Sequence, residues 1–322
     1  MPILAFLLTL TAISACLSPV PVSLLIRAAF HRSIAVAPEG YDDLIPHVEV
    51  IKDLTYPSEY QDNVADLYIP RGRQGPFPVV LWIHGGAFVG GDKRDVSIYA
   101  TALAAEGFAV VCINYRRAPE AGYPAPLLQT GEAYRWLTTI AEQHSLDLTR
   151  FALAGDSAGA HIAAQFVAIQ SNATYADEMG LAQMVPLHTL RATLLFCGPF
   201  DVARISQGDN PITNFLLGQA AWAYFGIKDF PTPLARQVTI ANHVTGNFPP
   251  TFITDGTRLS FASHGRDLAD TLLAQGVLTC SYFPAADMDA GHEYQFIMNT
   301  PAGQESFQHV VEFLETYLAA AQ

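Results

Sequence analysis

Two glycine-rich segments of the sequence carry residue types that could do chemistry together. In the first, an apolar run ends at Ala154 and leads into Gly155-Asp-Ser157-Ala-Gly159, and a stretch of small, helix-compatible residues follows. A serine hydroxyl is a poor nucleophile unless it is exposed beside a base and close to N–H donors that stabilise an oxyanion. A strand that turns sharply into a helix meets this need, because the helix N-terminus brings unpaired N–H groups. The pattern predicts Ser157 as a nucleophile, and a purely structural glycine-rich turn is the alternative.

The second segment lies about seventy residues upstream and fits the first. The apolar run Val79–Ile83 leads into His84-Gly85-Gly86-Ala-Phe. The N–H groups of Gly85 and Gly86 can point into a site because no Cβ obstructs them, and with the Ala158 amide they would form an oxyanion hole. We interpret His84 as a residue that braces this loop and does not titrate in catalysis.

A serine nucleophile requires a base, and the predicted one is His292. It stands in Asp289-Ala-Gly-His-Glu-Tyr294, after the apolar run Leu278–Phe283 and before a helix-like C-terminal stretch. This is the place of the histidine in the chain order Ser…acid…His. Other histidines precede the sheet or lack a strand-end context, and His161 falls on the helix that follows the serine.

The chain resembles the α/β-hydrolases of the hormone-sensitive lipase-like carboxylesterase group, whose signatures are H-G-G-A/G-F and G-D-S-A-G. The resemblance extends over about residues 50 to 320, with the motifs in order, as in a single-domain α/β enzyme. Further matches are Asn114-Tyr-Arg-Arg-Ala-Pro-Glu120, Tyr134-Arg-Trp136 and Pro249-Pro-Thr-Phe-Ile253. The resemblance implies ester hydrolysis through a serine nucleophile.

The acid is the one departure from the pattern of this group. Its members carry Asp or Glu a few residues past the strand that here ends near Thr254, and this chain has Leu259 at that position. A leucine can neither accept the imidazole N–H nor stabilise an imidazolium. We predict Asp255, at the end of the same strand, as the partner of His292. Asp201 is the alternative, although after Gly-Pro it is also suited to brace a loop through an Asx turn.

Apolar runs alternate with helix-like stretches along most of the 322 residues, half of which are hydrophobic. This rhythm predicts an α/β fold, the α/β-hydrolase fold, with a mostly parallel central sheet, helices on both faces and a helical lid. We expect one hydrolase domain over residues 22–322, with lid material from about residues 22–46 and 204–247. Segments His47–Leu54 and Val64–Ile69 read as antiparallel edge strands. The expected parallel strands are Val79–Ile83, Ala109–Ile113, Phe151–Ala154, Thr193–Cys197, Thr251–Thr254 and Leu278–Phe283.

The stretch Asn214–Phe225, within the second lid segment, is aromatic and apolar. Such an insertion can cap a pocket at the carboxyl ends of the strands and exclude water from it. Ordinary core packing is an equally good interpretation.

The N-terminal segment contains no charged side chain before Arg27, and Pro2–Leu17 is long enough for a signal-peptide core. Ile13-Ser-Ala-Cys16 resembles a lipoprotein cleavage site, whereas no Lys or Arg precedes the apolar run. Pro19 and Pro21 interrupt it and disfavour a regular membrane span. We expect a signal or anchor segment over residues 1–21, an exported or membrane-anchored protein, and membrane attachment through this segment only.

The net charge of −13 argues against nucleic acid and acidic lipid surfaces as partners. The four cysteines are scattered, and Cys112, Cys197 and Cys280 fall in expected strands, which favours buried free thiols. No metal-ligand spacing or nucleotide-binding loop occurs, so no cofactor or metal is expected. The expected partner is a small-molecule ester.

Three functions fit these observations. The first is a serine carboxylesterase that hydrolyses short-chain acyl esters through an acyl-enzyme, with Ser157, His292 and Asp255 as the triad. The second is a non-catalytic small-molecule receptor on the same scaffold, as the plant gibberellin receptors are; Leu259 favours it and the retained serine and histidine oppose it. The third is a peptidase, or an esterase for aryl- or sugar-linked acyl groups, because one triad cleaves amides and esters.

Overall fold

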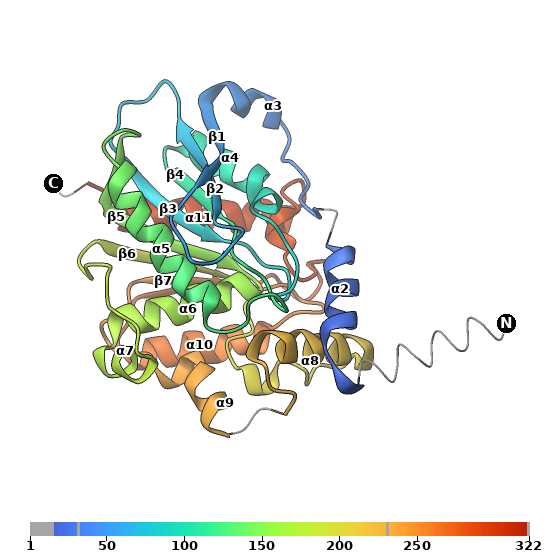
Figure 1. Ribbon diagram of the computed structural model, residues 1–322. Helices are drawn as coiled ribbons and strands as arrows, with labels where there is room; N and C mark the ends of the chain where they lie inside the picture. The colour runs from blue at the N-terminus through green and yellow to red at the C-terminus, as the bar shows by residue number, and fades with distance from the viewer. Residues whose placement is uncertain (1–15, 31–32, 230–231, 321–322) are drawn as a thin grey trace.

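The computed structural model describes residues 16–30, 33–229 and 232–320. At its centre is an eight-stranded sheet in the order β1-β2-β4-β3-β5-β6-β7-β8 (Figure 1). β2 pairs antiparallel with β1 and with β4, and every other neighbouring pair is parallel. The predicted mostly parallel sheet with antiparallel strands at one edge is therefore confirmed. The strands are β1 Val48–Thr55, β2 Val64–Pro70, β3 Phe77–Ile83, β4 Ala109–Ile113, β5 Leu146–Asp156, β6 Leu190–Phe196, β7 Thr251–Thr254 and β8 Thr279–Tyr282.

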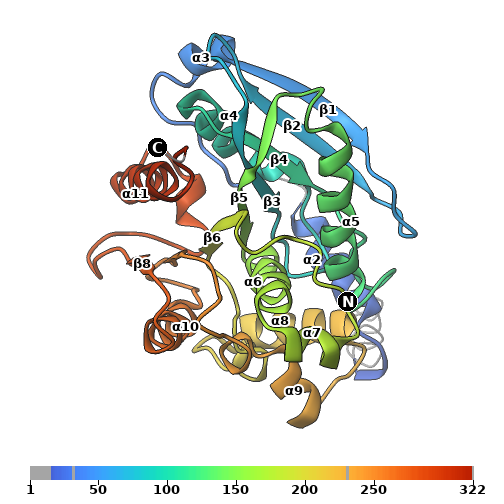
Figure 2. The ribbon, with the colours of Figure 1, turned by 90° about the vertical axis from the view of Figure 1, so that its left-hand side faces the viewer.

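Helices cover both faces of this sheet, as Figure 2 shows. Side chains on β3 alternate between two buried clusters. Val79 and Leu81 belong to the cluster that includes α5, α6 and α10, whereas Val80 and Trp82 belong to the one that includes α4 and α11. A strand that is buried on both faces is apolar at nearly every position, and this explains the apolar runs in the sequence. The helices of the sheet layers are α4 Ser97–Glu106, α5 Ala125–Ile140, α6 Ala158–Ser171, α7 Ala173–Met179, α10 Ala262–Ala274 and α11 Pro301–Tyr317.

A separate group of helices lies beside the carboxyl ends of the parallel strands. α2 (Val20–Ala29) contacts α8 (Pro211–Phe225), and α9 (Thr232–Val238) follows (Figure 1). Arg27 fixes α2 to the body of the protein, because its guanidinium donates to Glu120 at 2.6 and 2.7 Å and to two backbone carbonyls. We propose that α2 and the segment of α8 and α9 form the lid.

Two sequence-based expectations need correction. Within the expected lid segment 22–46, the short helix α3 (Tyr41–Leu44) packs beside α4 and not with α2 and α8, so the lid material ends before it. Cys280, expected to be buried, is exposed because β8 is the edge strand of the sheet, whereas Cys112 and Cys197 are buried free thiols. The expected signal or anchor segment falls mainly on residues 1–15, outside the described residues. Within the described part of the chain, no helix is both long and apolar enough to cross a membrane.

Candidate active site

Ser157 occupies a sharp turn between a strand and a helix. β5 ends at Asp156, α6 begins at Ala158, and Ser157 between them has φ +49°, in the left-handed region that favours glycine. Both motif glycines are required by close packing: a Cβ at Gly155 would overlap the carbonyl of Gly159, and one at Gly159 would overlap the carbonyl of Ile83. The strained turn places the serine at the N-terminus of α6, with its hydroxyl beyond the end of the strand.

His292 lies within hydrogen-bond reach of this serine. Its Nε2 is 3.0 Å from Ser157 Oγ, although the two residues are 135 positions apart in the sequence. The histidine follows β8 in a loop whose backbone pairs with the loop after β7, where the His292 N–H donates to the Arg258 carbonyl at 3.0 Å. The imidazole packs edge-on against Phe261, with ring centroids 5.5 Å apart. A neutral imidazole in this place can take the hydroxyl proton.

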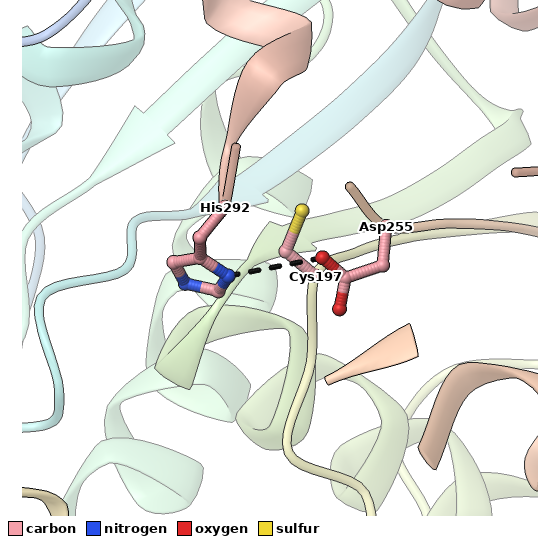
Figure 3. A group of neighbouring side chains, drawn as sticks. All are labelled: Cys197, Asp255 and His292. Carbon is pink, nitrogen blue, oxygen red and sulfur yellow. Dashed lines mark ion pairs between the residues drawn. The ribbon is translucent and has the colours of Figure 1, made fainter. Parts of the chain in front are cut away.

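Asp255 faces the other ring nitrogen of His292 (Figure 3). Its Oδ1 is 3.8 Å from His292 Nδ1, and its side chain is only 1% exposed. The carboxylate is held by two backbone N–H groups, those of Gly256 and Phe261, each at 2.7 Å. At 3.8 Å the pair is beyond hydrogen-bond distance, and a shift of about 1 Å would make the bond, as catalytic contacts often tighten only with substrate bound. The structure thus brings together the three side chains expected to form the triad.

The alternative acid and the leucine lie in other surroundings. The Asp201 carboxylate caps the short helix η3 (Val202–Arg204), where it accepts from the Ala203 N–H and pairs with Arg204 at 2.7 Å. Leu259 is 69% exposed and has φ +50° in the loop after β7. Asp201 therefore performs the bracing role that its Gly-Pro context also suggested.

Cys197 lies beside the histidine and aspartate, and the ligand atoms of the three residues are within 4.8 Å of one another. Figure 3 shows its sulfur next to the Asp255 carboxylate. Burial, together with the neighbouring negative charge of Asp255, raises the pKa of this thiol well above its ordinary value. A thiol that stays protonated is a poor metal ligand. This is the only such group among the described residues.

The amide groups that are available to an oxyanion differ in part from those expected. The Gly85 N–H already donates to Asp156 Oδ2 at 2.7 Å, so it is not free to bind an oxyanion. Among the described residues, no acceptor is found for the N–H groups of Gly86, Ala87 and Ala158. The sequence could not exclude Gly85 as a donor, because it does not show that the Asp156 carboxylate accepts the hydrogen bond of the Gly85 N–H. We propose Gly86, Ala87 and Ala158 as the donors.

His84 braces the loop that carries these amides. It is fully buried, stacks on Tyr115 with ring centroids 4.5 Å apart, and contacts the Gly85 carbonyl through Nδ1 at 2.6 Å. Burial lowers the pKa of His84 to about 4, so the imidazole is neutral at pH 7. This agrees with the structural role expected from the sequence.

A pair of acids under the site was missed by the sequence analysis. Glu293, next to His292, hydrogen-bonds to Asp156, next to Ser157, and its Oε1 is buried. Asp156 also accepts from Trp82 Nε1 and from the Gly85 amide, both at 2.7 Å. Burial raises the pKa of both carboxyls, and in Glu293 the charge of Asp156 adds to the effect. We propose that a proton shared by the pair ties the serine turn, the oxyanion loop and the histidine loop together. The only signal in the sequence was that each acid is adjacent to a predicted catalytic residue.

Glu293→Gln tests this proton sharing. Because the folded-state pKa of Glu293 is raised, the wild type loses stability as pH rises from the ordinary glutamate pKa toward the raised one. Glutamine keeps an N–H donor for Asp156 and has no such pH-dependent cost. We therefore expect the melting temperature of the variant relative to the wild type to increase by roughly a few degrees between pH 5 and pH 9. Glu142→Gln, at an exposed position, is the control. A difference that is the same at every pH would contradict the proton sharing.

One cavity is lined in part by Ser157, and a second shares Ile205, Leu217 and Phe261 with it. The first, about 10 Å³ in volume, is apolar, and its lining includes Phe88, Pro199, Leu217, Ala220 and Phe261. The second, about 770 Å³, is a more polar cleft on the other side of Leu217 and Phe261. Its polar lining includes Gln207, Asn210, Asn214, Arg258 and Ser260. Ser157 therefore lies beside a narrow apolar space and close to a wide polar one.

The fold and the strand–serine–helix turn together define an α/β-hydrolase. A model of the BD-FAE family matches residues 65–264, more than half of the chain, and the chain belongs to this family.

Known esterases are similar to this chain. Carboxylesterase NlhH of Mycobacterium tuberculosis is 29% identical over 254 residues, which are 76% of this chain and 75% of the relative. Esterase LipI of the same organism is 45% identical over 93 residues, 28% of this chain. The match to LipI, and those to two rice proteins named as probable isoprenylcysteine methylesterases, span only 27% to 29% of those relatives.

Solved structures share the fold over nearly the whole chain. Esterase B from Lactobacillus rhamnosis, crystallised with an inhibitor, superimposes with a TM-score of 0.75 at 20% identity and covers 95% of this chain and 96% of its own. A bacterial heroin esterase gives a TM-score of 0.69 at 23% identity over 87% of this chain and 90% of its own. At these identities the likeness concerns the fold. The relatives named as esterases agree with the resemblance of the sequence motifs to those of carboxylesterases.

Proposed function

We propose that this protein is a serine carboxylesterase that needs no cofactor. One observation carries the proposal: Ser157 Oγ lies 3.0 Å from His292 Nε2 at a strained strand-to-helix turn, with unpaired amide N–H groups beside it. The names of the related proteins, among them a carboxylesterase over three quarters of the chain, support the same activity.

In this mechanism Ser157 Oγ attacks the acyl carbonyl while His292 Nε2 takes the hydroxyl proton. The carbonyl oxygen becomes an oxyanion bound by the N–H groups of Gly86, Ala87 and Ala158, and Asp255 stabilises the imidazolium. His292 then gives its proton to the alkoxide as the ester C–O bond breaks, which leaves an acyl-serine. A water molecule, deprotonated by the same histidine, hydrolyses the acyl-serine and releases the acid.

The narrow apolar space beside Ser157 supports short acyl chains. At about 10 Å³ it needs side-chain movement to admit even a small acyl group, and every further methylene requires more of the lid to move. We expect kcat/KM for p-nitrophenyl acetate and butyrate to exceed that for the decanoate by at least about tenfold. Comparable rates on long-chain esters or triglyceride emulsions would contradict the short-chain assignment.

The polar cleft favours a polar alcohol portion in the substrate, and so keeps sugar-linked esters as a second candidate within the same chemistry. Comparing an acetylated sugar with an alkyl acetate of similar size separates the two candidates. A folded sample with no esterase activity would instead favour the receptor, and cleavage of p-nitroanilides would favour a peptidase.

We also propose that residues 1–21 are a signal or anchor segment that directs the protein out of the cytoplasm or to a membrane. The uncharged, apolar composition of the segment supports this. The mass of the mature N-terminus, measured on protein from cells that express the full chain, tests it.

A further inference from the structure

An uncharged apolar face on the lid has no role in the proposed reaction. α2 and α8 contact each other (Figure 1), and both carry large apolar side chains that are exposed. We call this surface the α2–α8 face, and it consists of Val20, Leu24, Leu25, Ile212, Phe215 and Leu216. Clustered exposed apolar residues mark a surface that contacts a partner or a membrane, whereas scattered ones are ordinary.

Charge is nearly excluded from both helices. α8 contains no Asp, Glu, Lys or Arg in its fifteen residues. α2 contains only Arg27, whose guanidinium is paired with Glu120 and with backbone carbonyls of the protein. Soluble surface helices alternate apolar and charged faces, so two adjoining helices without a free charge are suited to an apolar medium.

The same helix connects this face to the catalytic serine. On α8, Leu217 and Ala220 line the apolar space beside Ser157, while Ile212, Phe215 and Leu216 are exposed. A medium that contacts the outer side of α8 is therefore one helix away from the acyl site.

The sequence that precedes α2 indicates the occupant. Residues 1–15 contain no charged side chain, and this apolar stretch leads into the helix that forms half of the face. The net charge of −13 disfavours an anionic lipid surface. We infer that the α2–α8 face docks onto a bilayer of zwitterionic phospholipid, so that the lid and the mouth of the site rest on the membrane. This goes beyond the N-terminal attachment proposed above, because it assigns binding to a folded surface, and it does not depend on the esterase activity.

The experiment is co-sedimentation of the full chain with phosphatidylcholine vesicles. The wild type and the catalytically inactive Ser157→Ala variant should both bind. Leu24→Glu/Leu25→Glu and Ile212→Glu/Phe215→Glu should each lower the lipid–water partition coefficient at least about tenfold, because charge replaces apolar area that leaves water on docking. Leu273→Glu/Leu278→Glu, at two leucines exposed outside the face, is the matched control and should bind like the wild type. Circular dichroism confirms that each variant is folded, and turnover of a soluble short ester does the same for every variant that retains Ser157.

Three results would overturn the inference. The wild type could fail to bind vesicles. The face variants could bind as well as the wild type, which would assign any binding to the N-terminal segment alone. Sedimentation velocity could also show a dimer that the face variants dissociate, without vesicle binding, and the occupant would then be a second copy of this chain.

Discussion

Ser157→Ala is expected to reduce kcat by about 10⁶-fold, because the reaction loses its nucleophile while the base and the oxyanion donors remain. A residual rate of about 10³- to 10⁴-fold over water is expected from the oxyanion hole and substrate binding alone. The fold should be unaffected, because alanine is smaller than serine and adopts the same left-handed backbone at this turn with a similar strain. The measurement is turnover of p-nitrophenyl butyrate together with intact-protein mass after incubation with an organophosphonate.

The phosphonate experiment also identifies the nucleophile. A single adduct on Ser157 is expected in the wild type and none in the alanine variant. Ser281→Ala, at an exposed serine on β8, is the control and should retain both adduct and activity. Labelling that survives Ser157→Ala would show that another residue is the nucleophile.

The second large effect concerns the acid. Asp255→Asn is expected to lower kcat/KM by about 10⁴-fold, the scale seen when a triad carboxylate is made neutral. Asparagine cannot stabilise the imidazolium that forms when His292 takes the serine proton. The Asp255 carboxylate accepts hydrogen bonds from two backbone N–H groups, and the amide nitrogen of asparagine would face one of them as a second donor. A small loss of stability is therefore expected as well. Melting temperatures measured beside the kinetics separate these two contributions.

Asp201→Asn is the matched control for this prediction. Asp201 caps a short helix and pairs with Arg204, so its replacement should lower activity far less than that of Asp255. If the two effects were reversed, Asp201 would be the partner of His292. If neither variant lost activity, His292 would work without a carboxylate, and Leu259→Asp, which restores an acid at the position typical of the group, should then raise the rate.

Local spacing was enough to predict the nucleophile and its turn. Gly155, Ser157 and Gly159 are within five positions, and the requirement for a strand before and a helix after them is visible in the neighbouring residues. The apolar runs likewise predicted the sheet, because strands buried on both faces have few polar positions. β5 was the least complete prediction: it begins at Leu146, earlier than the expected Phe151, because Leu146 and Asp147 pair with Phe77 and Pro78 across a register shift that no local pattern shows.

His292 could be predicted from chain order, since the carboxyl ends of the parallel strands meet at one edge of the sheet. Its acid was less certain, because the loop after β7 has Leu259 where the acid of the group is expected. Only the packing of that loop decides which carboxylate faces the imidazole. In the structure the Gly256 and Phe261 amides hold Asp255 toward His292, while Leu259 is exposed.

The pairing of polar groups from different segments of the site was decided by tertiary structure alone. Gly85 follows β3, Asp156 ends β5 and Glu293 follows β8. Nothing local to any of them shows that the Asp156 carboxylate accepts hydrogen bonds from the Gly85 amide and from Glu293. The narrow space beside Ser157 has the same origin, because its walls come from the oxyanion loop, α8 and the loop after β7. The sequence by itself therefore determined the fold class and was enough to predict the nucleophile and the base, each of which depends on a short segment or on chain order. The pairing of buried charges and the size of the pocket depend on contacts between distant segments, which form only when the chain packs.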